Sequence, residues 1–132
     1  MHFSFDQMQL FERYKDVKNY AFGGNGKSSV VSAEDKQSYW DIYQNLNSIF
    51  KQVLATSKYS ADFVVKGHNY SKERGVRGHR PKSIWCAFRN KESHVFNQMP
   101  QIYVVLSEEG VETGFAVSIP ESDYHDQNIK IQ

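Results

Sequence analysis

The sequence has little cysteine and no long apolar run, and these two absences narrow the class of protein. Cys86 is the only cysteine among 132 residues, so the chain has no internal disulfide framework. No stretch approaches the roughly 18 consecutive apolar residues of a transmembrane helix. The N-terminal residues also lack the apolar run and cleavage site of a signal peptide. We therefore expect a cytoplasmic protein in a reducing compartment that crosses no membrane.

An excess of charge of one sign is also absent, because the formal net charge is only +1. Aromatic residues are abundant, at 14% of the chain against a hydrophobic fraction of 39%. Phe and Tyr are therefore expected to supply much of the core volume. The length fits one domain with one core, which we expect to cover residues 1–132.

Apolar residues recur at helical spacing in two segments of the first half. They predict a short amphipathic helix over 5–19, capped by Ser4, and a longer helix over 33–56. Ser32 begins the second helix with a capping-box pattern. Between the helices, residues 22–29 contain three glycines and predict a flexible loop.

The second half changes to the alternation and turn residues of β-structure. A hairpin turn is predicted at 108–110, and the polar tail 121–132 follows Pro120. Strands are predicted at 62–66, 83–89, 101–107 and 111–119. Helices first and a meandering sheet second predict an α+β fold. We expect N-terminal helices (1–57) packed on a mainly antiparallel, curved β-sheet (60–120).

Positive charge is concentrated in the central part of the chain. Eight of the sixteen Lys and Arg residues lie in the window of residues 66–91, namely Lys66, Lys72, Arg74, Arg77, Arg80, Lys82, Arg89 and Lys91. Residues 108–126, by contrast, contain six acids and no Lys or Arg. Tyr70 and Trp85 are interleaved with the basic residues. Cations neutralise phosphates and aromatic faces stack on exposed bases, so the window predicts a nucleic-acid interface. Two plainer interpretations stay open: the charges solvate a long loop, and Trp85 packs in the core.

Patterns for nucleotide hydrolysis, metal binding and catalysis are weak. Residues 21–28 (AFGGNGKS) match only the end of the phosphate-binding pattern G-x-x-x-x-G-K-[ST], because Ala21 replaces the first glycine. The histidines near the loop lack ligand spacings such as H-x-x-x-H, so we expect no metal. Cys86 on a strand is more typical of a buried residue than of a nucleophile. We expect neither catalytic residues nor a cofactor.

Short motifs of the second half follow one another in a distinctive order. They are FVVKG at 63–67, Gly78, SIWCAF at 83–88, QIYVVL at 101–106 and GFAVS at 114–118. This order resembles the N-terminal DNA-recognition domain of McrB-type modification-dependent restriction proteins. Two positions depart from the family pattern, since Ile84 stands at the family's proline and Gln101 at its glycine.

The resemblance implies a phage-defence module that reads a modified base, such as a methylated cytosine, by flipping it into an aromatic pocket. It implies that Trp85 and Tyr103 line this pocket, with Tyr70 as the third aromatic. The DNA backbone is then expected to meet Lys72, Arg74, Arg77, Arg80, Lys82 and Arg89. The implied partners are double-stranded DNA, a C-terminal motor domain and a nuclease subunit. Catalysis would lie on those partners, so this chain is not expected to be an enzyme.

Two other binding modes stay open. The same surface suits RNA or single strands, which PUA-like and OB-like domains grip by stacking. Alternatively, the basic loop docks on an acidic protein and contacts no nucleic acid. Competition between RNA, duplex DNA and a protein partner separates the three.

Overall fold

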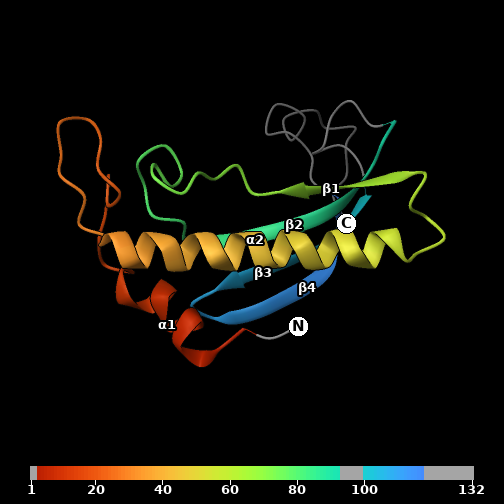
Figure 1. Ribbon diagram of the computed structural model, residues 1–132, viewed down its shortest axis with the longest axis horizontal. Helices are drawn as coiled ribbons and strands as arrows, with labels where there is room; N and C mark the ends of the chain where they lie inside the picture. The colour runs from red at the N-terminus through yellow and green to blue at the C-terminus, as the bar shows by residue number, and fades with distance from the viewer. Residues whose placement is uncertain (1–2, 93–99, 118–132) are drawn as a thin grey trace, which may run out of the picture.

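The fold is known from a computed structural model, which describes residues 3–92 and 100–117. Within these ranges the chain forms two helices and one antiparallel sheet of four strands in the order β1-β2-β3-β4 (Figure 1). This confirms the expected α+β class. The expected polar tail, 121–132, lies outside the described residues. No helix in the described ranges is both long and apolar enough to span a membrane.

The first helix, α1, covers Phe5–Arg13 and is shorter than the helix expected over 5–19. Ser4 caps it as expected: the Ser4 side chain accepts a hydrogen bond from the Gln7 N–H at 3.2 Å, and the Gln7 side chain accepts one from the Ser4 N–H at 3.0 Å. Phe5, at the start of α1, is not part of its buried side, because it is 75% exposed. Leu10 and Phe11 supply the buried side of α1.

The second helix, α2, covers Ala33–Ala55 and agrees with the expected helix over 33–56. The Ser32 side chain caps it by accepting a hydrogen bond from the N–H of Asp35 at 3.1 Å. Its buried side chains follow helical spacing and are Tyr39, Ile42 and Leu46. This stripe fixes which side of α2 lies on the sheet.

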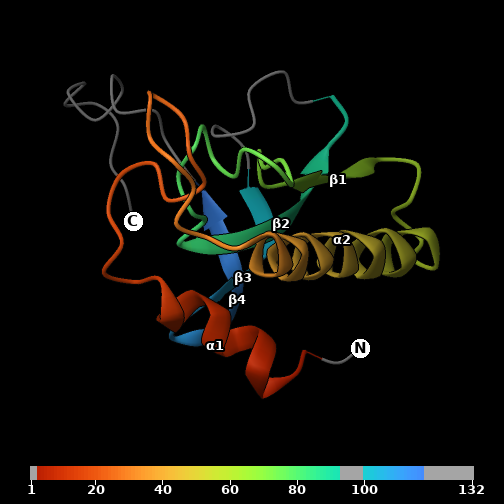
Figure 2. The same cartoon turned by 60° about the vertical axis from the view of Figure 1, so that its left-hand side comes forward.

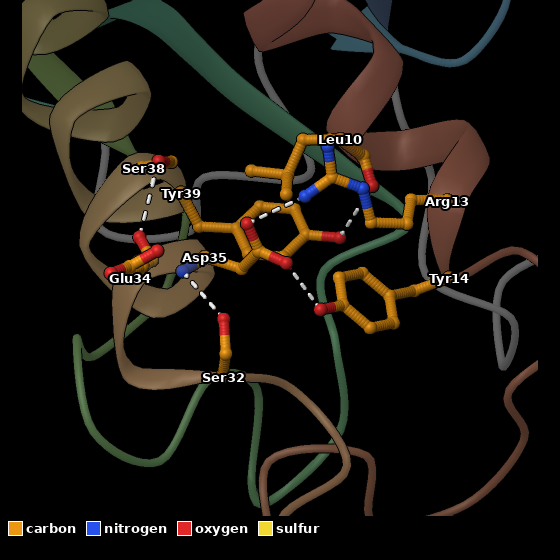
Figure 3. A network of polar contacts seen from close by, with 8 residues as sticks. All are labelled: Leu10, Arg13, Tyr14, Ser32, Glu34, Asp35, Ser38 and Tyr39. Atoms are coloured by element: carbon orange, nitrogen blue, oxygen red, sulfur yellow. Dashed lines mark hydrogen bonds and ion pairs between the residues drawn. The ribbon is translucent and has the colours of Figure 1, made fainter.

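A polar network ties the end of α1 to the start of α2 (Figure 3). Arg13 donates to a carboxylate oxygen of Asp35 at 2.7 Å, and the Tyr14 hydroxyl donates to the other oxygen. Deeper in the junction, the Tyr39 hydroxyl donates to the carbonyl of Leu10 at 3.1 Å. Burial opposes ionisation of Asp35, but the hydrogen bonds from Tyr14 and Arg13 outweigh it and lower the pKa of Asp35. The network therefore fixes the angle between the two helices.

The sheet is a meander in which each strand pairs with the next along the chain. Its strands are β1 (Phe63–Gly67), β2 (Ser83–Asn90), β3 (Pro100–Ser107) and β4 (Gly110–Val117). All four lie within a few residues of the expected strands. Both views show α2 lying along one side of the sheet (Figures 1 and 2). We call this side the helix face. Its buried residues include Ile84, Cys86, Val104 and Leu106.

The loop of residues 22–29 and the loop that joins β1 to β2 pack on each other beyond the N-terminal end of α2 (Figure 2). The Phe22 N–H donates to the carbonyl of Gly78 at 2.9 Å, and the Tyr20 ring stacks on His79 with centroids 4.7 Å apart. Gly24 and Lys27 exchange two backbone hydrogen bonds of 2.9 and 3.1 Å. Residues 22–29 thus form a loop, as expected, and the bridge between Gly24 and Lys27 closes a turn within it.

Candidate nucleic-acid interface

The strand register places Trp85 and Tyr103 on the same side of the sheet. Trp85 pairs with Val105, and Ala87 pairs with Tyr103, so the two aromatic residues are diagonal neighbours on β2 and β3. Side chains of a strand alternate between faces, and Cys86 points to the helix face. Trp85 and Tyr103 therefore lie on the opposite side, which we call the outer face. Diagonal neighbours are about 7–8 Å apart, which is within reach of aromatic side chains.

Trp85 is half-buried, and the ring of His68 lies beside it. His68 follows the end of β1 and continues its pairing, because the His68 N–H donates to the carbonyl of Trp85 at 3.0 Å. The two rings stack with centroids 5.7 Å apart and planes 26° from parallel. Burial lowers the pKa of His68, while hydrogen bonding to the Ser83 backbone opposes this, so the neutral ring is favoured. This pair was not predicted from the sequence. It could have been found by continuing the alternation of β1 one residue beyond Gly67, which places His68 on the same face as Lys66.

Tyr103 is held in place by β4. A side chain at Gly114 would bring its Cβ to 2.8 Å from the Tyr103 hydroxyl and 3.0 Å from the ring, so the ring lies close over this residue. The Tyr103 hydroxyl donates to a carboxylate oxygen of Glu112 at 2.7 Å, and this bond raises the pKa of Tyr103. The missing side chain at Gly114 and the acceptor at Glu112 therefore pre-orient the Tyr103 ring.

Two cations share the outer face with the aromatic residues. Lys66 on β1 pairs with Ala87, and Arg89 lies two residues further along β2, so both point to the same side as Trp85. Lys66 is exposed. Arg89 is half-buried, and within the described residues its Nε has no hydrogen-bond acceptor. The outer face thus combines stacking surfaces with donors suited to phosphate.

The loop after β1 presents some of its expected cations to solvent and buries another. Arg74, Arg77 and Lys82 are exposed, and Lys72 is half-buried. The loop is folded into two turns, closed by antiparallel bridges at Ser71–Gly75 and Val76–His79. Gly75 has a φ of +56°, and a Cβ there would clash with the carbonyl of His79. The exposed cations therefore belong to a loop whose backbone is held in two defined turns.

The structure corrects the expected place of Tyr70. Its side chain is 8% exposed and lies in an aromatic cluster with Phe22, Trp40 and Tyr43. This cluster belongs to the core on the helix side, because Trp40 and Tyr43 are residues of α2. The loop turns back over α2 directly after His68, which carries Tyr70 away from Trp85 and Tyr103.

Arg80 also differs from the expected solvent-facing contact. It is 9% exposed, and one terminal nitrogen donates to the carbonyl of Lys15 at 2.8 Å. The side chain of Arg80 therefore ties the chain after α1 to the loop after β1. Of the expected backbone contacts, Arg74, Arg77 and Lys82 are exposed, and Lys72 and Arg89 are half-buried.

The described residues offer little to metal or thiol chemistry. No three His, Cys, Asp or Glu side chains in residues 3–92 and 100–117 come together in a way that could hold a metal ion. Cys86 is fully buried on the helix face, and burial raises the pKa of its thiol to about 12. A thiolate nucleophile is therefore disfavoured at this position.

No protein-family model, curated protein or solved structure matches this chain. The features of this chain that bear on its function are therefore the geometry of the outer face and the basic residues near it.

Proposed function

We propose that this chain is a nucleic-acid-binding module that stacks an exposed base against Trp85 and Tyr103 on the outer face. The observation that carries this proposal is the register, which puts both aromatic residues on the side of the sheet away from α2. Stacking on an aromatic side chain is worth about 1–3 kcal/mol per base. Lys66 and Arg89 on the same face supply attraction for the phosphates.

The preferred ligand we propose is a modified cytosine flipped out of duplex DNA. Trp85 and Tyr103 are the two positions that the resemblance to McrB-type recognition domains assigns to the base pocket. Glu112 lies beside Tyr103 and is exposed, and a carboxylate accepts hydrogen bonds from the exocyclic amino group of cytosine. Flipping costs a few kcal/mol, which stacking and this hydrogen bond would offset. DNA cleavage and nucleotide hydrolysis would then belong to partner domains.

A second candidate is a module that binds RNA or single-stranded DNA. It is favoured by the position of the aromatic pair on a sheet face that bears neither of the two described helices. Aromatic residues on such a face form a stacking platform for unpaired bases. This candidate uses the same residues and differs in the strand that it prefers.

Fluorescence anisotropy at one moderate salt concentration tests the proposal. The ligands are one duplex, unmodified or carrying methylated or hydroxymethylated cytosine or methylated adenine, and the matching single strand and RNA. We expect Trp85→Ala to weaken binding to the preferred ligand by roughly tenfold, as the loss of one stacked base implies. Phe115→Ala is the matched control, because Phe115 is 69% exposed and lies on the other face, at the position paired with Ile102.

The pattern of affinities decides between the candidates. Tighter binding to one modified duplex supports the modified-base reader, and tighter binding to single strands or RNA supports the second candidate. If Trp85→Ala folds normally and binds every ligand as tightly as the wild type does, Trp85 is not part of the interface and the proposal is wrong.

A further inference from the structure

A second basic site lies between the chain that follows α1 and the end of the loop after β1. A cavity of about 520 Å³ opens there. Its polar lining consists of Lys15, Lys18, Asn19, His79, Arg80 and Lys82. Four of these side chains carry a permanent positive charge at neutral pH. We call this cavity the basic pocket.

Arg80 is the buried group of the basic pocket. Its side chain is 9% exposed, and one terminal nitrogen donates a hydrogen bond to the carbonyl of Lys15 at 2.8 Å. The Nε of Arg80 is buried and has no acceptor among the described residues. A buried charged donor without an acceptor is costly, so an anionic ligand in the basic pocket would be favourable here.

His79 adds a neutral donor to the same pocket. Its Nδ1 accepts a hydrogen bond from the Tyr20 N–H at 3.2 Å, and its ring stacks on that of Tyr20. A neutral imidazole that accepts at Nδ1 carries its proton on Nε2. His79 can therefore donate a hydrogen bond without adding a charge.

The acids near the basic pocket leave most of its positive charge unpaired. In residues 3–92 and 100–117 the ion pairs are Arg13 with Asp35 and Lys15 with Glu12. Glu108 and Glu109 line a smaller neighbouring cavity of about 160 Å³, together with Arg80 and Lys82. Lys18, Arg80 and Lys82 thus keep their charge available on the pocket side.

We infer that the basic pocket binds the phosphate of a ligand of nucleotide size. Its volume lies in the range of about 300–1,000 Å³ that is typical of small-molecule sites. The guanidinium, the three ammonium groups and the imidazole N–H of the basic pocket are donors of the kind that proteins use for phosphate. Asn19 adds an amide that can hydrogen-bond the rest of the ligand.

The phosphate can come from a nucleic-acid strand or from a free phosphorylated compound. Lys82 precedes Trp85 by three residues, which places their Cα atoms at most about 10 Å apart. A strand whose base stacks on Trp85 therefore passes near the basic pocket. The inference itself rests on the residues of the pocket and does not depend on the base-stacking proposal.

Calorimetric titration with pyrophosphate at constant ionic strength tests the inference on the whole chain. We expect saturable binding that Lys18→Gln and Lys82→Gln each weaken by about tenfold, the usual effect of losing one charged hydrogen bond. Lys58→Gln is the matched control, because Lys58 lies after α2, over the ring of Tyr59, and its loss should leave binding unchanged. Absence of saturable binding, or equal weakening by Lys58→Gln, would overturn the inference.

A competition experiment then identifies the source of the phosphate. If pyrophosphate displaces a fluorescent oligonucleotide from the wild type but less well from Lys18→Gln, the pocket holds a strand phosphate. If pyrophosphate binds and the oligonucleotide stays bound, the pocket holds a free phosphorylated compound. Failure of the base-stacking proposal is detected separately, because Trp85→Ala does not change the pocket.

Discussion

At the scale of single residues, Asp35 connects the two helices through its ionised form. Its carboxylate accepts hydrogen bonds from Arg13 and Tyr14, and its side chain is 15% exposed. These hydrogen bonds hold the pKa of Asp35 below its ordinary value even though burial opposes ionisation. A carboxyl group with a lowered pKa stabilises the fold above its unfolded pKa of about 3.9, and this contribution is lost as the pH falls through its folded pKa.

We therefore predict that Asp35→Asn lowers the free energy of unfolding at pH 7 by about 1 kcal/mol. The difference between variant and wild type should shrink as the pH falls below about 4, because the carboxyl of the unfolded wild type is then protonated and the advantage of the ionised folded form is progressively lost. Urea denaturation of both proteins at pH 7 and pH 3 measures this. An equal difference at the two pH values would show that ionisation of Asp35 contributes nothing.

At the scale of secondary-structure elements, the contact between α2 and the sheet holds the outer face in position. Ile42 of α2 is fully buried against the helix face, whereas Val53 on the same helix is 52% exposed. Burial on one side of β2 leaves the alternate residues, Trp85 among them, on the other side. The packing of α2 on the sheet therefore determines how firmly the backbone that bears Trp85 and Tyr103 is held.

We predict that Ile42→Ala lowers the free energy of unfolding by about 2–5 kcal/mol, as expected for a large-to-small change in a packed core. Val53→Ala should cost much less, at most about 1 kcal/mol, because half of that side chain is already in water. Chemical denaturation of the two variants gives both values. Similar costs for the two substitutions would contradict the packing described for α2.

Much of the secondary structure was predictable from the sequence, because the apolar residues of α2 and of the four strands recur with clear periodicity. The shared face of Trp85 and Tyr103 was implied only by a resemblance, since strand register is set by tertiary pairing and a slip of one residue reverses a side chain. Tyr70 was misplaced because loop charge and glycine content say nothing about which ring enters the core. The basic pocket was missed because Lys15 and Lys18 lie far in sequence from Arg80 and Lys82.

At the scale of the whole molecule, charge is distributed unevenly although the net charge is only +1. The loop after β1 exposes Arg74 and Arg77, while the turn between β3 and β4 carries exposed acids at Glu108 and Glu109. Such a distribution of charge steers an anionic polymer toward the loop after β1. Binding through this region releases counterions and is therefore sensitive to salt.

We predict that Arg77→Gln weakens binding to all nucleic-acid ligands alike and reduces the slope of log K against log salt by about 1. The reason is that a phosphate contact carries no information about base identity. Anisotropy titrations at several salt concentrations measure the slope. A variant that changes the preference for one base, with the slope unaltered, would place Arg77 at the base and not at the backbone.

The proposed function depends on the stacking of a base on Trp85, and tryptophan fluorescence reports on this contact. The chain has two tryptophans, so Trp40→Phe leaves Trp85 as the only reporter, and Trp85→Phe leaves Trp40 packed against Tyr43 in the core. Titration with the best-binding oligonucleotide should quench the fluorescence of Trp85 in the first variant and leave that of Trp40 unchanged in the second. Saturating binding without any change in Trp85 fluorescence would show that no base stacks on Trp85.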